Sequence, residues 1–126
     1  LKPDGVAVIQ TITINDQDFP HYRVSPDYIQ RYIFPGGMLP SPSALDEQID
    51  QAALQKLESF SFGHDYAKTL HLWNKNFQKV WPELLKMGFD TRFKRLWEQY
   101  LAYCEAGFNL DTVDVIQLKL LNPPAT

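Results

Sequence analysis

The chain has 126 residues, 44% of them hydrophobic and 13% aromatic, and a formal charge of −3 at pH 7. Its length allows one domain with a real core, and the acidic balance argues against nucleic-acid binding, because nucleic-acid phosphates attract basic surfaces. No apolar run approaches the roughly 20 residues that span a bilayer, and Cys104 is the single cysteine, which together favour a cytoplasmic protein without disulfides.

The first predicted element is a strand over residues 5–14, which are nearly all apolar or β-branched. This pattern is typical of an interior strand that is covered on both faces. Gln10 is the odd polar residue within it, so its buried amide would either bridge backbone groups or face a polar cavity. A polar loop over residues 15–24 follows, and Ser25 is then expected to cap a helix that runs to about residue 33.

The segment after this helix is the most specific local feature of the chain. Residues 32–41 read Tyr-Ile-Phe-Pro-Gly-Gly-Met-Leu-Pro-Ser. Pro35 disfavours helical geometry at Phe34, and Gly36 and Gly37 permit backbone angles that side chains forbid. The pattern predicts a sharply shaped apolar loop of the kind that lines a cavity.

One further helix and two further strands are predicted. Ser43 is expected to cap a surface helix that ends near Leu54, residues 56–62 alternate as a second strand, and residues 112–121 form a third. The resulting class is α/β, with about three strands and about five helices. One flank of such a sheet is unpaired, and the strand over residues 5–14 is the expected exposed one.

Two long helices are predicted from apolar residues that recur every three or four positions. The stripes are Tyr66, Leu70, Trp73, Phe77, Val80 and Trp81, and then Phe93, Leu96, Trp97, Tyr100, Cys104 and Phe108. Pro82 stops or kinks the first helix, and Asp90 caps the second. The two helices should pack together, and Cys104 is expected as a buried core thiol, not a nucleophile.

Among candidate functional side chains, Tyr66 stands at the start of a helix, where active-site groups are often displayed. The residue pattern alone favours a core tyrosine whose hydroxyl finds a local partner. His21, His64 and His71 lack metal-ligand spacing, so no metal site is predicted. The chain has neither the spaced glycines of a dinucleotide turn nor a Walker pattern, and it therefore carries no cofactor fingerprint.

Six basic residues crowd the turn between the two long helices, close to three tryptophans. They are Lys75, Lys79, Lys86, Arg92, Lys94 and Arg95, near Trp73, Trp81 and Trp97. One interpretation is a solvated basic face over core aromatics. The other is a surface that meets the anionic headgroups of a phospholipid membrane.

Four blocks of the sequence resemble the cyclopropane-fatty-acyl-phospholipid synthases and the related mycolic acid cyclopropane synthases, which are S-adenosylmethionine-dependent methyltransferases. The first block is Leu-Lys-Pro-Asp-Gly at residues 1–5, leading to Gln-Thr-Ile at 10–12. The second is the loop over residues 32–41, and the third is Phe-Gly-His-Asp-Tyr-Ala-Lys-Thr-Leu at 62–70, with Trp73. The last runs from Arg92 to Gln117, and the second and third blocks are specific.

The resemblance implies that residues 1–126 form a single partial domain, the C-terminal half of a Rossmann-like class I methyltransferase fold. Its mixed sheet would end in an antiparallel strand. The half that binds S-adenosylmethionine would lie upstream, so no cofactor-binding residue is expected here and the chain alone would be inactive. The implied partner of the chain is that missing half, and a homodimer through the exposed strand edge is the alternative.

In the intact protein, the resemblance implies transfer of a methylene group from S-adenosylmethionine to a cis double bond of a phospholipid acyl chain. Bicarbonate would remove the proton that ring closure releases, and Tyr66, Gln10 and the backbone at Ile12 would contact it. Gln10 stands where many family members have histidine. A carboxamide can still donate to the anion but cannot take up charge near neutral pH.

The same resemblance implies that the loop forms part of the wall around the acyl chain, with the face of Trp73 and Phe77 behind it. The implied substrate-binding residues are Phe34, Pro35, Gly36, Gly37, Met38, Leu39 and Trp73. The protein would act at the inner face of the membrane as a peripheral protein. The alternative function is a non-catalytic lipid-surface or dimerisation module, and the product, a ring, a methyl branch or a hydroxylated branch, stays open.

Overall fold

The structure is a computed structural model that describes residues 1–124. In chain order its elements are β1 (Val6–Ile14), α1 (Phe19–Val24), α2 (Tyr28–Tyr32), α3 (Pro42–Gln51), β2 (Gln55–Ser61), α4 (Gly63–Lys86), α5 (Thr91–Asn109) and β3 (Val113–Leu121). The predicted α/β class is confirmed, with three strands and five helices within this range.

The sheet is built around its last strand. The strand order is β1-β3-β2, and β3 runs antiparallel to both neighbours. β1 and β2 therefore point the same way, and the predicted reversal of the last strand is confirmed. A register shift between Lys56 and Glu58 interrupts the pairing of β2, so Leu57 leaves the regular alternation.

β1 occupies an edge of the sheet, which confirms the expected unpaired flank but corrects its expected interior position. Val6 and Val8 are 51% and 68% exposed. Gln10, predicted to be buried, is exposed as well. The apolar sequence of β1 suits a covered strand, yet residues 1–124 supply no element that covers its outer half.

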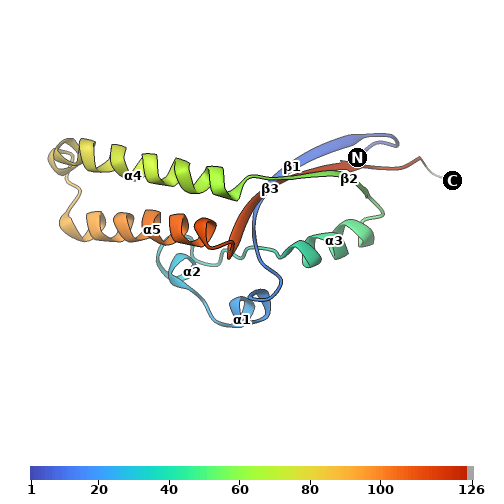
Figure 1. Ribbon diagram of the computed structural model, residues 1–126, viewed down its shortest axis with the longest axis horizontal. Helices are drawn as coiled ribbons and strands as arrows, with labels where there is room; N and C mark the ends of the chain where they lie inside the picture. The colour runs from blue at the N-terminus through green and yellow to red at the C-terminus, as the bar shows by residue number, and fades with distance from the viewer. Residues whose placement is uncertain (125–126) are drawn as a thin grey trace.

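The helices divide the molecule into two packed regions (Figure 1). α3 packs Ile49 against Ile116, Leu118 and Leu120 on one face of β3. α4 and α5 lie side by side and extend beyond the end of the sheet, and a separate core of Leu70, Phe77, Leu101, Phe108 and Val115, with Ala67, joins them to it. The predicted pairing of the two long helices is confirmed.

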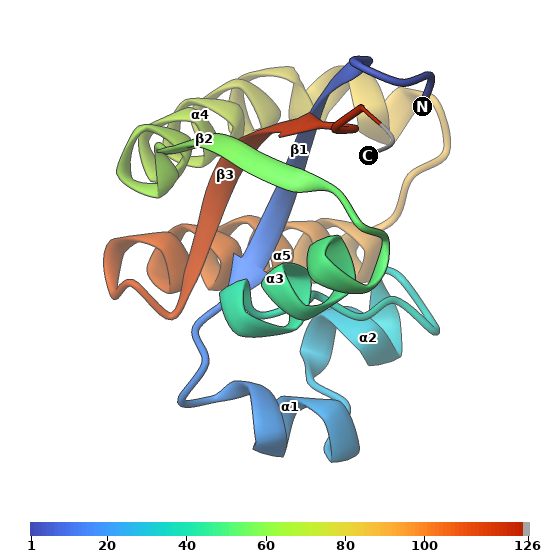
Figure 2. The same ribbon diagram turned by 90° about the vertical axis from the view of Figure 1, so that its right-hand side faces the viewer.

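α1 and α2 lie on the side of α5 away from α4, as both views show (Figures 1 and 2). α1 was predicted as loop, and Ser25 ends α1 instead of starting the next helix. α2 is capped by Asp27, whose carboxylate accepts from the Gln30 N–H while the Gln30 side chain accepts from the Asp27 N–H. This reciprocal capping box satisfies two free donors, whereas a serine cap satisfies one.

Two further helix boundaries differ from the prediction. Ser41, not Ser43, caps α3, because its hydroxyl accepts from the Ala44 N–H and Pro42 occupies the first turn. α4 continues past Pro82 to Lys86, where Leu84 still packs against the core. The predicted cap of α5 is confirmed, since the Asp90 carboxylate accepts from the Phe93 N–H at 2.8 Å.

None of the helices within residues 1–124 combines the length and the apolar character needed to cross a membrane.

Candidate functional site

A cavity of about 670 Å³ lies between β1, the α1–α2 region and α5. Its walls include Ile12 of β1, Tyr22 of α1, Ile29 of α2, and Tyr100 and Cys104 of α5. The volume falls within the roughly 300–1,000 Å³ of small-molecule sites. Since aliphatic and aromatic side chains dominate these walls, the cavity suits an apolar ligand.

The predicted loop closes one side of this cavity. Phe34, Gly37, Met38 and Leu39 line it, whereas Pro35 and Gly36 do not; they shape the turn that presents the other four. The φ of Gly36 is +81°, a conformation that favours glycine. The predicted sharp turn is therefore confirmed, and the proposed binding role of the loop stays a prediction.

An aromatic contact lies behind the loop, but not the predicted one. The Phe34 ring meets the Tyr100 ring edge-on at 6.2 Å between centroids. Trp73 instead packs edge-on against Tyr66 at 6.0 Å, and it is not among the residues that line the cavity. The wall behind the loop comes from α5, whereas the resemblance placed a face of α4 there.

Hydrogen bonds fix the loop and α2 in place. The Gln30 side-chain amide donates to the Gly37 carbonyl at 2.9 Å, and the Leu39 N–H donates to the Tyr22 hydroxyl at 3.0 Å. The Tyr28 hydroxyl donates to the Leu96 carbonyl of α5 at 2.8 Å. At the start of the loop the Phe34 N–H donates to the Ile29 carbonyl at 2.8 Å, so both ends of the loop are held.

Tyr103 adds a polar contact that sequence reasoning missed. Its hydroxyl donates to the Asp27 carboxylate at 2.9 Å and so joins α5 to the start of α2. Burial, together with the bond to Asp27, raises the pKa of Tyr103 to about 12. The only signal in the sequence was the Asp27-x-x-Gln30 capping pattern, which marks Asp27 but not its partner.

We expect Tyr103→Phe to lower the free energy of unfolding by about 1 kcal/mol at pH 7, because one hydrogen bond is lost. In the unfolded chain the tyrosine ionises near its ordinary pKa of 10.0, whereas in the folded protein the pKa of Tyr103 is about 12. The stabilisation from its neutral hydroxyl is complete below about pH 10 and lost as the pH rises to about 12. Urea unfolding across this range should show a shallower pH dependence in the variant, and equal slopes would contradict the assignment.

Cys104 packs against the core as expected, but it is only half-buried and also lies on the cavity wall. Burial, reinforced by the charge of Asp27, raises the pKa of its thiol to about 11. The thiol is therefore protonated near neutral pH, and only a thiolate is a strong nucleophile. The geometry assigns Cys104 to the shape of the cavity.

The other predicted site residues lie on one face of the sheet and on the first turn of α4. Ile12 pairs with Val115, and Gln10 pairs with Gln117 two positions along. Tyr66 belongs to the same apolar cluster as Ile12 and Val115, and its ring meets the Phe108 ring edge-on at 5.3 Å. The structure thus brings Tyr66 and Ile12 together. Ile12 also lines the cavity, which Tyr66 and Gln10 do not.

Tyr66 and Gln10 each have a hydrogen-bond donor without a partner among residues 1–124, although Gln10 is bonded through its side-chain oxygen. Tyr66 is half-buried, and its hydroxyl has no hydrogen-bond partner among residues 1–124, so the expected local partner is not found there. Since no buried polar side-chain atom in this range lacks a partner, the hydroxyl is open to solvent. The Gln10 side-chain oxygen accepts from the Gln117 amide at 2.9 Å. This leaves the amide nitrogen of Gln10 free to donate to another group.

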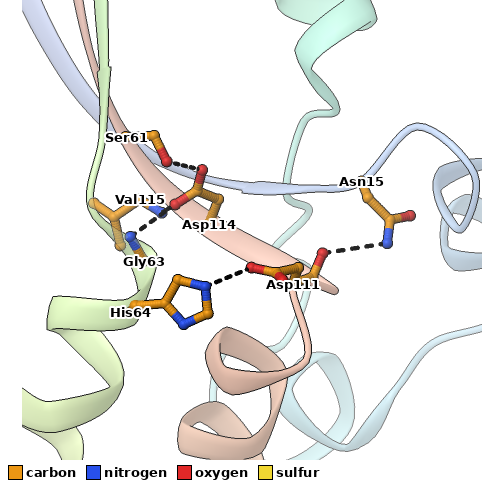
Figure 3. A network of polar contacts seen from close by, with 7 residues as sticks. All are labelled: Asn15, Ser61, Gly63, His64, Asp111, Asp114 and Val115. Atoms are coloured by element: carbon orange, nitrogen blue, oxygen red, sulfur yellow. Dashed lines mark hydrogen bonds and ion pairs between the residues drawn. The ribbon is translucent and has the colours of Figure 1, made fainter.

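A polar network anchors the start of α4 and with it Tyr66 (Figure 3). One oxygen of Asp114 accepts from the N–H groups of Gly63 and Val115, each at 2.8 Å, and the other accepts from the Ser61 hydroxyl. A Cβ at Gly63 would stand 2.5 Å from that first oxygen, so glycine is needed for this close approach. The carboxylate also lies at the positive end of the α4 dipole.

We expect Asp114→Ala to lower the free energy of unfolding by about 3 kcal/mol, because two backbone donors and one hydroxyl lose an ionised acceptor. The isosteric Asp114→Asn should cost only about 1 kcal/mol, since its amide oxygen can keep both backbone bonds. Urea unfolding of the full-length protein, followed by circular dichroism, checks both. Equal losses in the two variants would contradict the proposed network.

Two of the three histidines each lie beside one carboxylate. His64 lies 3.0 Å from a carboxylate oxygen of Asp111, and His71 lies 3.2 Å from one of Glu105. Within the described part of the chain, no group of three or more His, Cys, Asp or Glu side chains is arranged to hold a metal.

Comparisons with known proteins converge on lipid-modifying enzymes. The sequence model of the mycolic acid cyclopropane synthetase family matches residues 1–118. The chain is 40% identical over 132 aligned residues to the tuberculostearic acid methyltransferase UfaA1 of Mycobacterium tuberculosis, covering 98% of the chain and 30% of that protein. It is 32% identical to the cyclopropane-fatty-acyl-phospholipid synthase of Escherichia coli, covering 94% of the chain and 29% of that protein.

A solved structure of a mycolic acid cyclopropane synthase is also similar to the chain. The structure of the mycolic acid cyclopropane synthase CmaA1 complexed with SAH and CTAB superposes with a TM-score of 0.84 at 28% identity. The match covers 96% of this chain and 45% of that one. The chain thus spans about 30% of the length of these two curated relatives and less than half of the solved chain.

Proposed function

Because the chain belongs to the mycolic acid cyclopropane synthetase family, we propose that it forms the acyl-binding part of a lipid-modifying methyltransferase. The preferred reaction is transfer of a methylene group to a cis double bond of a phospholipid acyl chain. The observation that carries the proposal is the apolar cavity of about 670 Å³ closed by the loop from Phe34 to Leu39. A long hydrocarbon chain fits such a cavity better than a polar substrate does.

The residues of the cavity have two tasks in this reaction. The first is to hold an unsaturated chain against Ile12, next to the cluster that contains Tyr66. The second is to keep water away from a positively charged carbon of the chain, since water would trap it. Phe34, Met38 and Tyr100 supply apolar surface for both tasks. The bonds of Gln30 and Tyr22 hold the loop at Gly37 and Leu39, which lowers the ordering cost on binding.

The neutral donors near Ile12 fit a small anion such as bicarbonate. The Tyr66 hydroxyl and the Gln10 amide nitrogen can each donate a hydrogen bond, and within residues 1–124 only the side-chain oxygen of Gln10 has a partner, the Gln117 amide. When bound, S-adenosylmethionine supplies the methyl group and bicarbonate accepts the proton that ring closure releases. Tyr66, Gln10 and the backbone at Ile12 would position that anion. Gln10 does so without the charge that a histidine can take up.

We further propose that residues 1–126 are the C-terminal half of a class I methyltransferase fold and that another part of the protein binds S-adenosylmethionine. The coverage of 45% of the matched CmaA1 chain, which was solved with SAH, supports a division of this kind. The free edge of β1 and its exposed Val8 offer the surface on which the rest of the sheet would continue. Pairing of two copies through this edge is the alternative.

The reaction can be tested with the full-length protein, labelled S-adenosylmethionine and phospholipid vesicles that contain cis-unsaturated chains. The expected result is transfer of label into the acyl chains, with a gain of one CH₂ per modified chain by mass spectrometry. Loss of the olefinic protons with appearance of ring protons in NMR spectra identifies a cyclopropane, whereas a new methyl signal identifies a branch. Label that enters no lipid would overturn the proposal.

A further inference from the structure

The charges of the chain are distributed unevenly along the α4–α5 hairpin. Residues 75–95 contain six of the twelve basic residues and two of the fifteen acidic ones, a formal charge of +4, whereas the rest of the chain carries −7. This stretch forms the end of the hairpin farthest from the N-terminus (Figure 1). The molecule is therefore strongly polarised, with its positive end at the hairpin turn.

Most of these cations are free to meet an external anion. Lys94 pairs with Glu98 at 3.5 Å and lies over the Trp81 ring at 5.6 Å. Among residues 1–124, no carboxylate pairs with the other five, which are Lys75, Lys79, Lys86, Arg92 and Arg95. Unpaired cations on one end of a protein are attracted to surfaces of high negative charge.

The same turn exposes large apolar side chains between the cations. Leu85, Met87 and Phe89 are 55%, 73% and 37% exposed. Gly88, with a φ of +98°, lies in the short turn between α4 and α5, and Met87 and Phe89 flank it there. An acidic protein surface would match the cations but not this apolar tip, whereas a lipid interface matches both.

A row of aromatic rings runs along α5 from this tip to the cavity. Phe89 meets Phe93 at 4.7 Å between centroids, and Phe93 stacks on Trp97 at 5.9 Å. Trp97 meets Tyr100 at 4.9 Å, and Tyr100 meets Phe34 on the cavity wall. The tip and the cavity are thus joined by continuous apolar contacts.

We propose that the hairpin tip, residues 85–95, binds anionic phospholipid bilayers by inserting Leu85, Met87 and Phe89 at the headgroup level while the basic residues contact lipid phosphates. The aromatic row then provides an apolar path along which an acyl chain leaves the bilayer for the cavity. This last step rests on the proposed function, whereas bilayer binding does not.

Vesicle sedimentation of the full-length protein tests the binding, with phosphatidylcholine alone or with about one third phosphatidylglycerol. Replacing Leu85 and Met87 together by glutamine should weaken binding to the anionic vesicles about tenfold. Replacing Lys86 and Arg92 together by glutamine should also weaken it about tenfold and reduce its salt dependence. Both residue pairs are exposed, so neither change should affect folding.

Matched controls exist at the other end of the hairpin. Leu110→Gln removes an apolar side chain that is 75% exposed, and Lys68→Gln removes an exposed cation, both far from the tip. Neither should change vesicle binding. The proposal is overturned if the wild type does not sediment or if the apolar variant binds as well as the wild type. Weakening by the charge variant alone would show electrostatic attachment without insertion of the apolar side chains, and it would overturn the proposal too.

A turnover measurement separates this inference from the proposed function. With substrate in vesicles, the Leu85 and Met87 variant should lose activity about tenfold, and with substrate dispersed in detergent it should retain it. Vesicle binding without any transfer to lipid would leave the inference standing and remove the proposed reaction. Transfer that is insensitive to the tip would keep the reaction and overturn the delivery path.

Discussion

Tyr66→Phe should lower the turnover of the full-length protein about 100-fold, because one preorganised hydrogen-bond donor to an anion is typically worth 10²–10³ in rate. The change removes only the hydroxyl, which forms no bond within residues 1–124. The ring keeps its edge-on contacts with Phe108 and Trp73. The free energy of unfolding should therefore change by less than about 1 kcal/mol.

Transfer of labelled methyl groups to lipid, measured beside urea unfolding, checks both parts of this prediction. Tyr32→Phe is the matched control, because it removes a tyrosine hydroxyl from a side chain that is 61% exposed and does not line the cavity. It should change the free energy of unfolding by less than about 1 kcal/mol and turnover less than about twofold. Unchanged turnover in Tyr66→Phe would remove Tyr66 from the reaction. Equal losses in both variants would show a general effect of lost hydroxyls.

Local chemistry predicted the elements of this fold better than their boundaries. The Asp90 cap and the turn at Gly36 follow from single residues whose backbone preferences have no competitor nearby. Ser25 and Ser43 each compete with a second capping residue two positions away, and tertiary contacts decide between them. α1 has six residues and depends on the burial of Tyr22, so no propensity rule could identify it.

For the candidate site, too, the sequence predicted local features but not the contacts between distant residues. Pro35 and the two glycines after it predict the loop. Ile12 and Tyr66 pack against one apolar cluster, as the resemblance implies. The bond between Tyr103 and Asp27 joins residues 76 positions apart, and the Phe34–Tyr100 contact depends on where α2 packs on α5. Such pairs are set by the packing of helices, on which a single sequence carries no direct signal.

β1 shows the opposite case: its sequence suits a strand with a neighbour on each side, but residues 1–124 provide a neighbour on one side only. Its nearly continuous apolar run suits a strand between two others, but β1 lies at an edge and exposes Val8. The mismatch supports the proposal that another part of the protein continues the sheet at this edge, and the partial coverage of the matched relatives is consistent with that proposal.

Cys104→Phe should lower the kcat/KM for long acyl chains about tenfold or more, because the new ring occupies part of the cavity that the half-buried thiol borders. Shorter chains should be affected less, so the variant should change chain-length preference as well as rate. The measurement is competition between unsaturated lipids of different chain length in the full-length protein.

Cys104→Ala is the matched control, and it separates the shape of the cavity from the chemistry of the thiol. With a pKa raised to about 11, the thiol is protonated at neutral pH, so its removal should change turnover less than about twofold. Full activity of Cys104→Phe on long chains would show that the acyl chain binds elsewhere. A loss in Cys104→Ala as large as that in Cys104→Phe would assign the thiol a chemical role. A loss confined to the bulky variant is the result that identifies this cavity as the acyl site.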